Sequence, residues 1–171
     1  MRNFMKTNGF TLVELMVTVA VAAILLTVAI PGFDALMQEQ RAATQSNHLL
    51  TALNLARSEA VKRGARVSAC PSSNGTACSG SDWTVGWMVY TDTATTDTTS
   101  TVGEVLRVWS APRGIETLSG ASHVRYRGSG ELLNADPVNL TLKPKGCSGQ
   151  RARNIRIGLT GQAGVQGKQS C

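Results

Sequence analysis

The chain has 171 residues, with 17 lysines and arginines against 11 aspartates and glutamates and a formal net charge of +6. When a short leader and one apolar segment are set aside, roughly 140 residues remain, enough for one domain with its own core. This length is too short for two domains that each have a hydrophobic core. The net positive charge is modest, and the charged residues are unevenly distributed along the chain.

Residues 10–30 form an apolar segment that is long enough to cross a bilayer as a helix, and Glu14 is its one charge. A carboxylate in such a segment is costly in lipid and usually marks a functional pairing. The preceding leader, residues 1–9, has no apolar core of its own. An ordinary secretory signal is cut after its apolar region, but here the small residue Gly9 lies before it. We therefore expect processing to leave the apolar helix on the mature protein.

This N-terminus resembles that of type IV pilins and type II secretion pseudopilins. In that family, prepilin peptidase cuts after the glycine, the new N-terminal phenylalanine is methylated, and a glutamate follows four residues later. Gly9, Phe10 and Glu14 match this pattern position by position. The resemblance implies that Glu14 pairs with the amine of Phe10 on a neighbouring subunit. It also implies one span, residues 10–30, in the inner membrane, with the globular domain in the periplasm.

The helical pattern resumes after Pro31, a residue that removes one backbone hydrogen bond and predicts a kink. We expect the helix to end near Arg63, because Gly64 is a natural C-terminal cap. One helix over residues 10–63 is therefore predicted. Its second half is amphipathic, with apolar positions at Phe33, Leu36, Met37, Ala43, Leu50, Leu53, Leu55, Ala56 and Ala60.

Residues 64–171 read as a β-rich globular domain, so the predicted class is α+β, a long helix packed against antiparallel sheets. Short runs rich in β-branched and aromatic residues alternate with turn residues. They predict strands at 66–70, 83–91, 104–110, 123–127, 138–142 and 154–158. The polar, threonine-rich stretch 91–101 is expected to be a mobile loop. The glycines at 158, 161 and 164 indicate a turn between late strands.

Two segments narrow the resemblance. Leu55-Ala-Arg-Ser-Glu-Ala-Val-Lys-Arg63 at the helix end and Asp82-Trp-Thr-Val-Gly-Trp-Met-Val-Tyr90 look like the GspH/FimT group of minor pilins and minor pseudopilins. In this pilin fold two small β-sheets pack on the helix. The resemblance implies a protein of the priming complex that starts or caps a filament. Its implied partners are other minor pilins, the major pilin and prepilin peptidase.

The four cysteines, Cys70, Cys78, Cys147 and Cys171, are expected to form disulfides, which persist outside the cytoplasm. Four cysteines allow three connectivities, and the sequence alone does not choose among them. We favour sequential pairing, because the first two cysteines bracket a turn-rich loop and the last two can tie down the C-terminal tail. No C-x-x-C motif or neighbouring histidine supports zinc, so we expect no metal site.

The sequence carries no nucleophile elbow, zinc-protease motif, phosphate-binding loop or paired-carboxylate pattern. We therefore expect neither an enzyme nor a cofactor. His48 and His123 are interpreted as ordinary surface or packing residues. The three tryptophans are interpreted as core residues rather than as a platform for stacking bases, and they are Trp83, Trp87 and Trp109.

The C-terminal segment is basic, because no acidic residue follows Asp136. If its cations lie on one face, they can bind DNA phosphates; the candidates are Lys143, Lys145, Arg151, Arg153 and Arg156. Strand alternation separates the last of these from the two arginines before it, so only part of the cluster makes one face. Some FimT-type proteins bind incoming DNA through a Gly-Arg-x-Arg motif. Residues 161–164 here are Gly-Gln-Ala-Gly, without either arginine.

The sequence therefore favours a minor pilin that primes a type IV pilus and is incorporated at its tip. Two alternatives remain open. One is a pilus-tip DNA receptor for natural transformation, and the other is a minor pseudopilin of a type II secretion system.

Overall fold

The computed structural model describes residues 10–171, and its first element is the helix α1, Leu12–Arg63. The predicted leader 1–9, with the cleavage residue Gly9, lies outside the described residues. The second half of α1 belongs to a compact unit, Gln38–Cys171, that also holds all the strands. The residues before Gln38 form a separate unit. The boundary between the units therefore falls within the helix rather than at its end.

The end of α1 follows from the backbone freedom of Gly64, which has a φ of +59°. The N–H of Gly64 bonds the carbonyl of Val61, and the N–H of Ala65 bonds the carbonyl of Ala60, both at 3.3 Å. This pair of bonds is a Schellman cap, which satisfies carbonyls that the helix leaves free. The helix ends at Arg63, where the sequence predicts its end.

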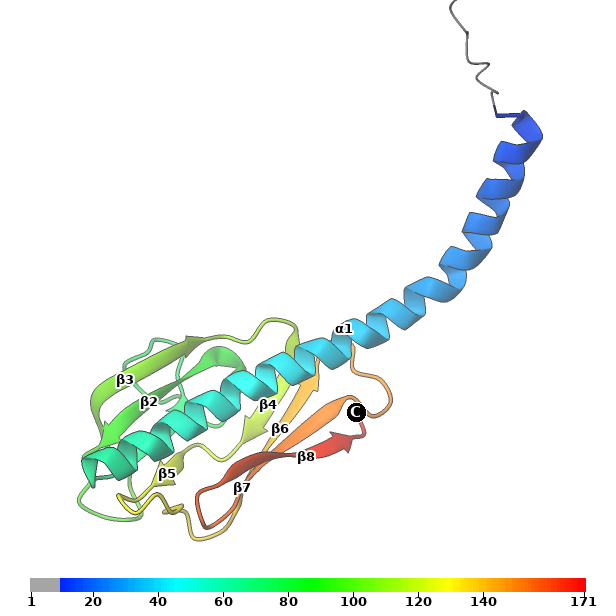
Figure 1. Cartoon of the computed structure of the whole chain (residues 1–171). Helices are drawn as coiled ribbons and strands as arrows, with labels where there is room; N and C mark the ends of the chain where they lie inside the picture. Colours follow the sequence, from blue (N-terminus) through cyan, green and yellow to red (C-terminus); the bar gives the residue numbers. More distant parts are fainter. Residues whose placement is uncertain (1–9) are drawn as a thin grey trace, which may run out of the picture. The chain divides into compact units, whose positions relative to one another are not determined.

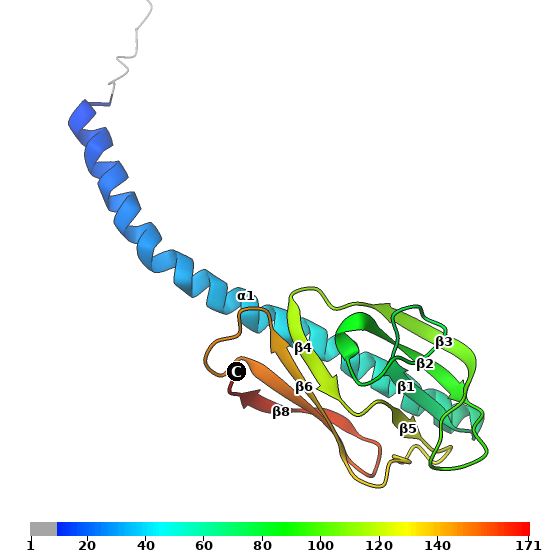
Figure 2. The same ribbon diagram turned by 180° about the vertical axis from the view of Figure 1, so that it is seen from behind.

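Eight strands follow α1 and form two four-stranded antiparallel sheets (Figures 1 and 2). The first sheet has the order β3-β2-β1-β5 and the second the order β4-β6-β7-β8. The fold is thus the α+β class predicted, a long helix followed by antiparallel sheets. The strands are β1 Val67–Pro71, β2 Gly86–Asp92, β3 Val102–Ser110, β4 Ile115–Gly120, β5 Val124–Tyr126, β6 Val138–Pro144, β7 Ala152–Ile157 and β8 Ala163–Gln169.

The core of the compact unit lies between α1 and the inner faces of both sheets. The helix contributes a stripe of fully buried positions with helical spacing, four of them alanines that let the strands lie close. The predicted stripe is only partly right, because Phe33 and Leu36 precede the compact unit and are 63% and 54% exposed. The buried helix positions are Ala42, Leu49, Ala52, Leu53, Ala56 and Ala60.

Three strand predictions need correction. Trp83–Val85 is a 3-10 turn rather than the start of a strand, because the Asp82 carboxylate accepts a hydrogen bond from the Thr84 N–H at 2.9 Å and caps it. The strands β4 and β8 were not predicted at all. Both are edge strands of the second sheet.

Candidate functional site

The first turn of α1 holds the sequence-predicted assembly residue, Glu14. Thr11 precedes the helix, and its Oγ1 accepts a hydrogen bond from the Glu14 N–H at 3.2 Å. Threonine at the N-cap with glutamate three residues later is the capping-box spacing, a signal that the sequence interpretation missed. The carboxylate also lies where the positive end of the helix dipole favours negative charge.

The apolar side chains of this first part of α1 are solvent-exposed. Phe10 is 82% exposed and Leu12 is 73% exposed, and the same holds along the helix as far as Leu26 at 58%. No single helix within residues 10–171 is long and apolar enough to span a membrane. The pair Leu12–Thr27 and Gly32–Arg63 passes that test of length and composition when the two are taken together. Such exposed apolar surface indicates contact with lipid or other apolar helices.

The predicted basic cluster does not form one surface. Arg153, on β7, is buried and forms an ion pair with Glu39 of α1. Lys168, on β8, lies 3.1 Å from the same carboxylate. Although no acidic residue follows Asp136 in the sequence, Glu39 of the helix thus pairs with two of the C-terminal cations. Hydrogen bonding from Lys168, with the charge of Arg153, holds the pKa of Glu39 below its usual value of 4.5.

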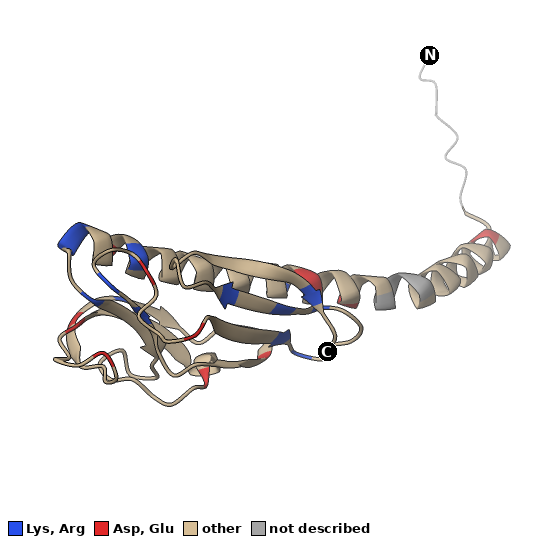
Figure 3. Cartoon of the chain, turned by 90° about the horizontal axis from the view of Figure 1, so that it is seen from below, with Lys and Arg blue, Asp and Glu red and all other residues tan. Residues whose placement is uncertain are grey.

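The other candidates point to different places. Lys143 Nζ donates to the carbonyl of Cys171 at 2.6 Å, and Arg151 donates to Ser148 at 2.6 Å. Arg156 is exposed on the opposite face of β7 from Arg153. In Figure 3 the basic positions are distributed over α1 and several strands rather than gathered along one. These residues therefore do not form one continuous face for binding phosphates.

The cysteines are joined as Cys70–Cys78 and Cys147–Cys171, with Cα atoms 5.7 and 5.6 Å apart. The first bond closes the loop after β1, and the second fixes the C-terminal residue to the loop after β6. His123 lies within 4.8 Å of Cys70 and Cys78. Since both sulfurs are bonded to each other, this cluster offers no thiolate to a metal.

The tryptophans differ in their surroundings. Trp83 and Trp87 are buried, as expected of core residues. Trp109 is half-buried, and the guanidinium of Arg107 lies 4.9 Å from the centre of its ring. It lies on the edge strand β3, so only part of the ring faces the core. His48 is exposed on α1.

A buried ion pair that the sequence did not predict lies under the threonine-rich loop. Asp92, at the end of β2, accepts a hydrogen bond from Arg125 Nε of β5 at 3.1 Å. Ser68 donates to the same carboxylate at 3.0 Å, and the N–H groups of Ala94 and Thr101 donate at 3.1 and 3.0 Å. Every oxygen of this carboxylate is therefore paired, as a buried charge requires.

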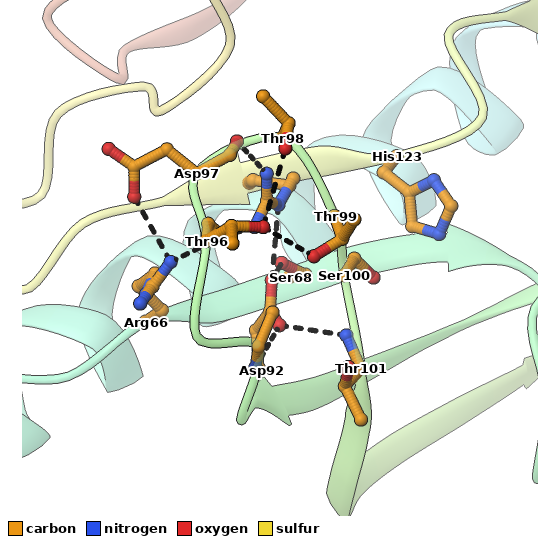
Figure 4. Close-up of polar contacts among 12 residues, drawn as sticks. Arg66, Ser68, Asp92, Thr96, Asp97, Thr98, Thr99, Ser100, Thr101 and His123 are labelled. Atoms are coloured by element: carbon orange, nitrogen blue, oxygen red, sulfur yellow. Dashed lines mark hydrogen bonds and ion pairs between the residues drawn. The ribbon is translucent and has the colours of Figure 1, made fainter.

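The loop above this pair is held by its own contacts (Figure 4). Arg125 donates to the carbonyls of Thr96 and Asp97, and Arg66 donates to the Asp97 carboxylate at 3.1 Å. Arg127 contacts the same carboxylate at 3.2 Å. These contacts attach the loop, which the sequence predicts to be mobile, to Arg66, Arg125 and Arg127.

Comparison with known proteins now identifies the family. Residues 45–161 match the family described as "Type II transport protein GspH", and residues 4–30 match the "Prokaryotic N-terminal methylation motif". Among curated proteins, none matches the chain.

Two solved structures share the fold. The type IV minor pilin FimU of Pseudomonas aeruginosa is 20% identical, with a TM-score of 0.59, over 77% of this chain and 96% of that one. The minor pseudopilin EpsH from the type II secretion system of Vibrio cholerae is 15% identical, with a TM-score of 0.51, over 74% of this chain and 97% of that one. Because the GspH match spans most of the sequence and the methylation motif precedes it, the chain belongs to the GspH family of minor pilins and minor pseudopilins.

Proposed function

We propose that this protein is a minor pilin that primes assembly of a type IV pilus and is incorporated at its tip. The observation that carries the proposal is the exposed apolar start of α1, which holds one charge, Glu14, in its first turn. A helix of this kind is stable only in lipid or among other apolar helices. A pilin meets both environments in succession, because it lies in the membrane before assembly and among other apolar helices in the filament.

In this proposal prepilin peptidase removes residues 1–9 by cutting after Gly9, and the new amine of Phe10 is methylated. Residues 10–30 anchor the chain once in the inner membrane. The domain of residues 64–171, packed on the end of the helix that reaches Arg63, lies in the periplasm. The two disulfides support that compartment, because such bonds persist there.

Glu14 then acts as the assembly residue. When helices bundle away from water, a buried carboxylate needs a counter-ion. The amine of Phe10 on a neighbouring subunit is the natural partner, because residues 10 and 14 are about one helical turn apart and so lie near the same depth in a bundle of parallel helices. Other minor pilins and the major pilin are the proposed neighbours.

The second candidate is a minor pseudopilin of a type II secretion system. The description of the matching family and the similarity to EpsH favour it. Both machines use the same fold and the same processing, so only the phenotype of a deletion strain distinguishes the two assignments. Deleting the gene is expected to lower the number of surface pili and to leave protein secretion unchanged. Loss of secretion with normal piliation would reverse this assignment.

Two substitutions test the processing and the pairing. Gly9→Val is expected to leave an unprocessed precursor in the inner membrane, whereas Gly32→Val, a glycine with open space around its Cβ position, is processed normally. Glu14→Leu is expected to insert and to be processed, yet to assemble poorly, because the partner amine loses its counter-ion. Asp34→Leu on the same helix is the charge-matched control. Normal pilus number with Glu14→Leu would defeat the pairing.

A further inference from the structure

Two adjoining hollows follow α1 between Gln40 and His48, on the side faced by the loop that joins β3 to β4. Their volumes are about 490 and 370 Å³, and they share Gln45 and Arg113 as lining residues. Figures 1 and 2 both show that loop running beside the helix. We call the two hollows together the α1 groove. All of it lies within the compact unit Gln38–Cys171.

One end of the α1 groove is basic. Arg41 from the helix, Arg113 from the loop and Lys145 after β6 line the larger hollow, and no acidic residue lines it. All three side chains are exposed, and none makes an ion pair with another residue of the described part of the chain. Lys168 and Arg153, by contrast, share the carboxylate of Glu39. The cations of the groove are therefore free to meet an anionic ligand.

The other end is apolar and aromatic. Trp87, Trp109 and Val108 line the smaller hollow, and Val108 is 49% exposed. Trp87 is almost fully buried, so Trp109 and Val108 supply the apolar surface that a ligand can reach.

The length of the groove sets the size of its ligand. From Gln40 to His48 the helix advances about 12 Å, which is the span of about four extended residues. A nucleic acid strand carries a phosphate at every nucleotide, so its charge would run along the whole groove. Here Arg41 and Lys145 line only the larger hollow and Arg113 lies where the two hollows meet, so the charge is concentrated toward one end, which favours an amphipathic chain.

We propose that the α1 groove binds an extended acidic peptide segment of a partner protein. Carboxylates of the segment lie against Arg41, Arg113 and Lys145, and an aromatic or aliphatic side chain packs on Trp109 and Val108. This site goes beyond the role in filament assembly and does not depend on which filament the protein enters.

The probe is a fluorescein-labelled peptide of about six residues in which glutamate alternates with phenylalanine. Its binding to the full chain in a neutral detergent is measured by fluorescence anisotropy. The triple variant Arg41→Gln, Arg113→Gln, Lys145→Gln is expected to weaken binding by about tenfold, since each rim charge contributes modestly.

A control triple variant removes the same charge outside the groove, at Lys62, Arg127 and Arg156, and is expected to bind as the unaltered protein does. Val108→Asp, at an exposed position, is expected to weaken binding by adding an acid to the groove. Circular dichroism establishes that each variant is folded.

Three results would overturn the proposal. The first is no saturable binding of the acidic peptide by the unaltered protein. The second is an equal loss of binding in both triple variants. The third is displacement of the peptide by single-stranded oligothymidylate, if the oligonucleotide binds more tightly than the peptide and its affinity falls in the Val108→Asp variant. That result would make the groove a nucleic acid site. A matched peptide with glutamine in place of glutamate is expected to bind at least about tenfold more weakly.

Discussion

Replacing Asp92 by asparagine removes the charge from the most deeply buried ion pair that residues 10–171 form. The side chains of Asp92 and Arg125 are 0% and 7% exposed. Asparagine keeps one oxygen for the N–H groups of Ala94 and Thr101. It places an amide N–H₂ where the second oxygen accepts from Arg125 and Ser68, so a donor then faces donors.

The expected cost follows from what Arg125 loses. Removing one partner of a buried pair typically costs about 3–5 kcal/mol, because the other charge is left uncompensated. Arg125 keeps the carbonyls of Thr96 and Asp97 as acceptors, so the lower end applies, about 3 kcal/mol. For a chain of 171 residues this corresponds to a fall in Tm of roughly 6–12 °C.

Thermal unfolding followed by circular dichroism measures this change, with Asp97→Asn as the control. Asp97 is 58% exposed in its pairs with Arg66 and Arg127, so its loss should cost less than about 1 kcal/mol. If Asp92→Asn lowers the Tm no more than Asp97→Asn does, the buried pair is not the anchor that its geometry indicates.

The same variant has a defined pH dependence. Burial opposes ionisation of Asp92, but hydrogen bonds from Thr101, Ala94, Ser68 and Arg125 outweigh it and hold the pKa below the usual 3.8. A depressed pKa contributes stability that is present above the unfolded value and is lost as the pH falls through the folded one. The Tm difference between the two proteins should therefore be constant above about pH 5 and shrink below about pH 4.

Two further changes test the C-terminal part of the domain. Replacing Cys147 and Cys171 by serine opens a loop with a sequence separation of 24. The free energy of unfolding should therefore fall by about 3 kcal/mol, and an unchanged Tm would show that the bond contributes nothing. Glu39→Gln leaves Arg153 buried without a counter-ion. Because Glu39 is 30% exposed, we expect a loss of about 1–3 kcal/mol at neutral pH, disappearing below about pH 4. A loss that persists in acid would point to packing rather than charge.

The sequence predicts the helix and the fold class well because both have local signals. The cap at Gly64 and the helical spacing of Leu53, Ala56 and Ala60 depend only on neighbouring residues. The strand β8 has no such signal, since its seven residues include two glycines and only Val165 is β-branched. Pairing with β7 makes it a strand, and pairing is a property of the whole fold.

The charged residues of the domain show the same limit. The basic character of Arg153 is visible in the sequence, but Glu39 lies more than a hundred residues earlier, and only the packing of β7 on α1 brings them together. Asp92 and Arg125 are joined in the same way across the first sheet. Counting charges along the chain therefore could not show that Arg153 pairs with an acid of the helix.

The place of the protein in the filament is decided by labelling sheared pili with an antibody raised against the compact unit Gln38–Cys171 and viewing them by immunogold electron microscopy. A tip-located minor pilin predicts gold at one end of each filament, and none on pili of a Glu14→Leu strain. Gold distributed along the filaments, or absent from pili while present in a secretion-system pseudopilus, would contradict the proposed role.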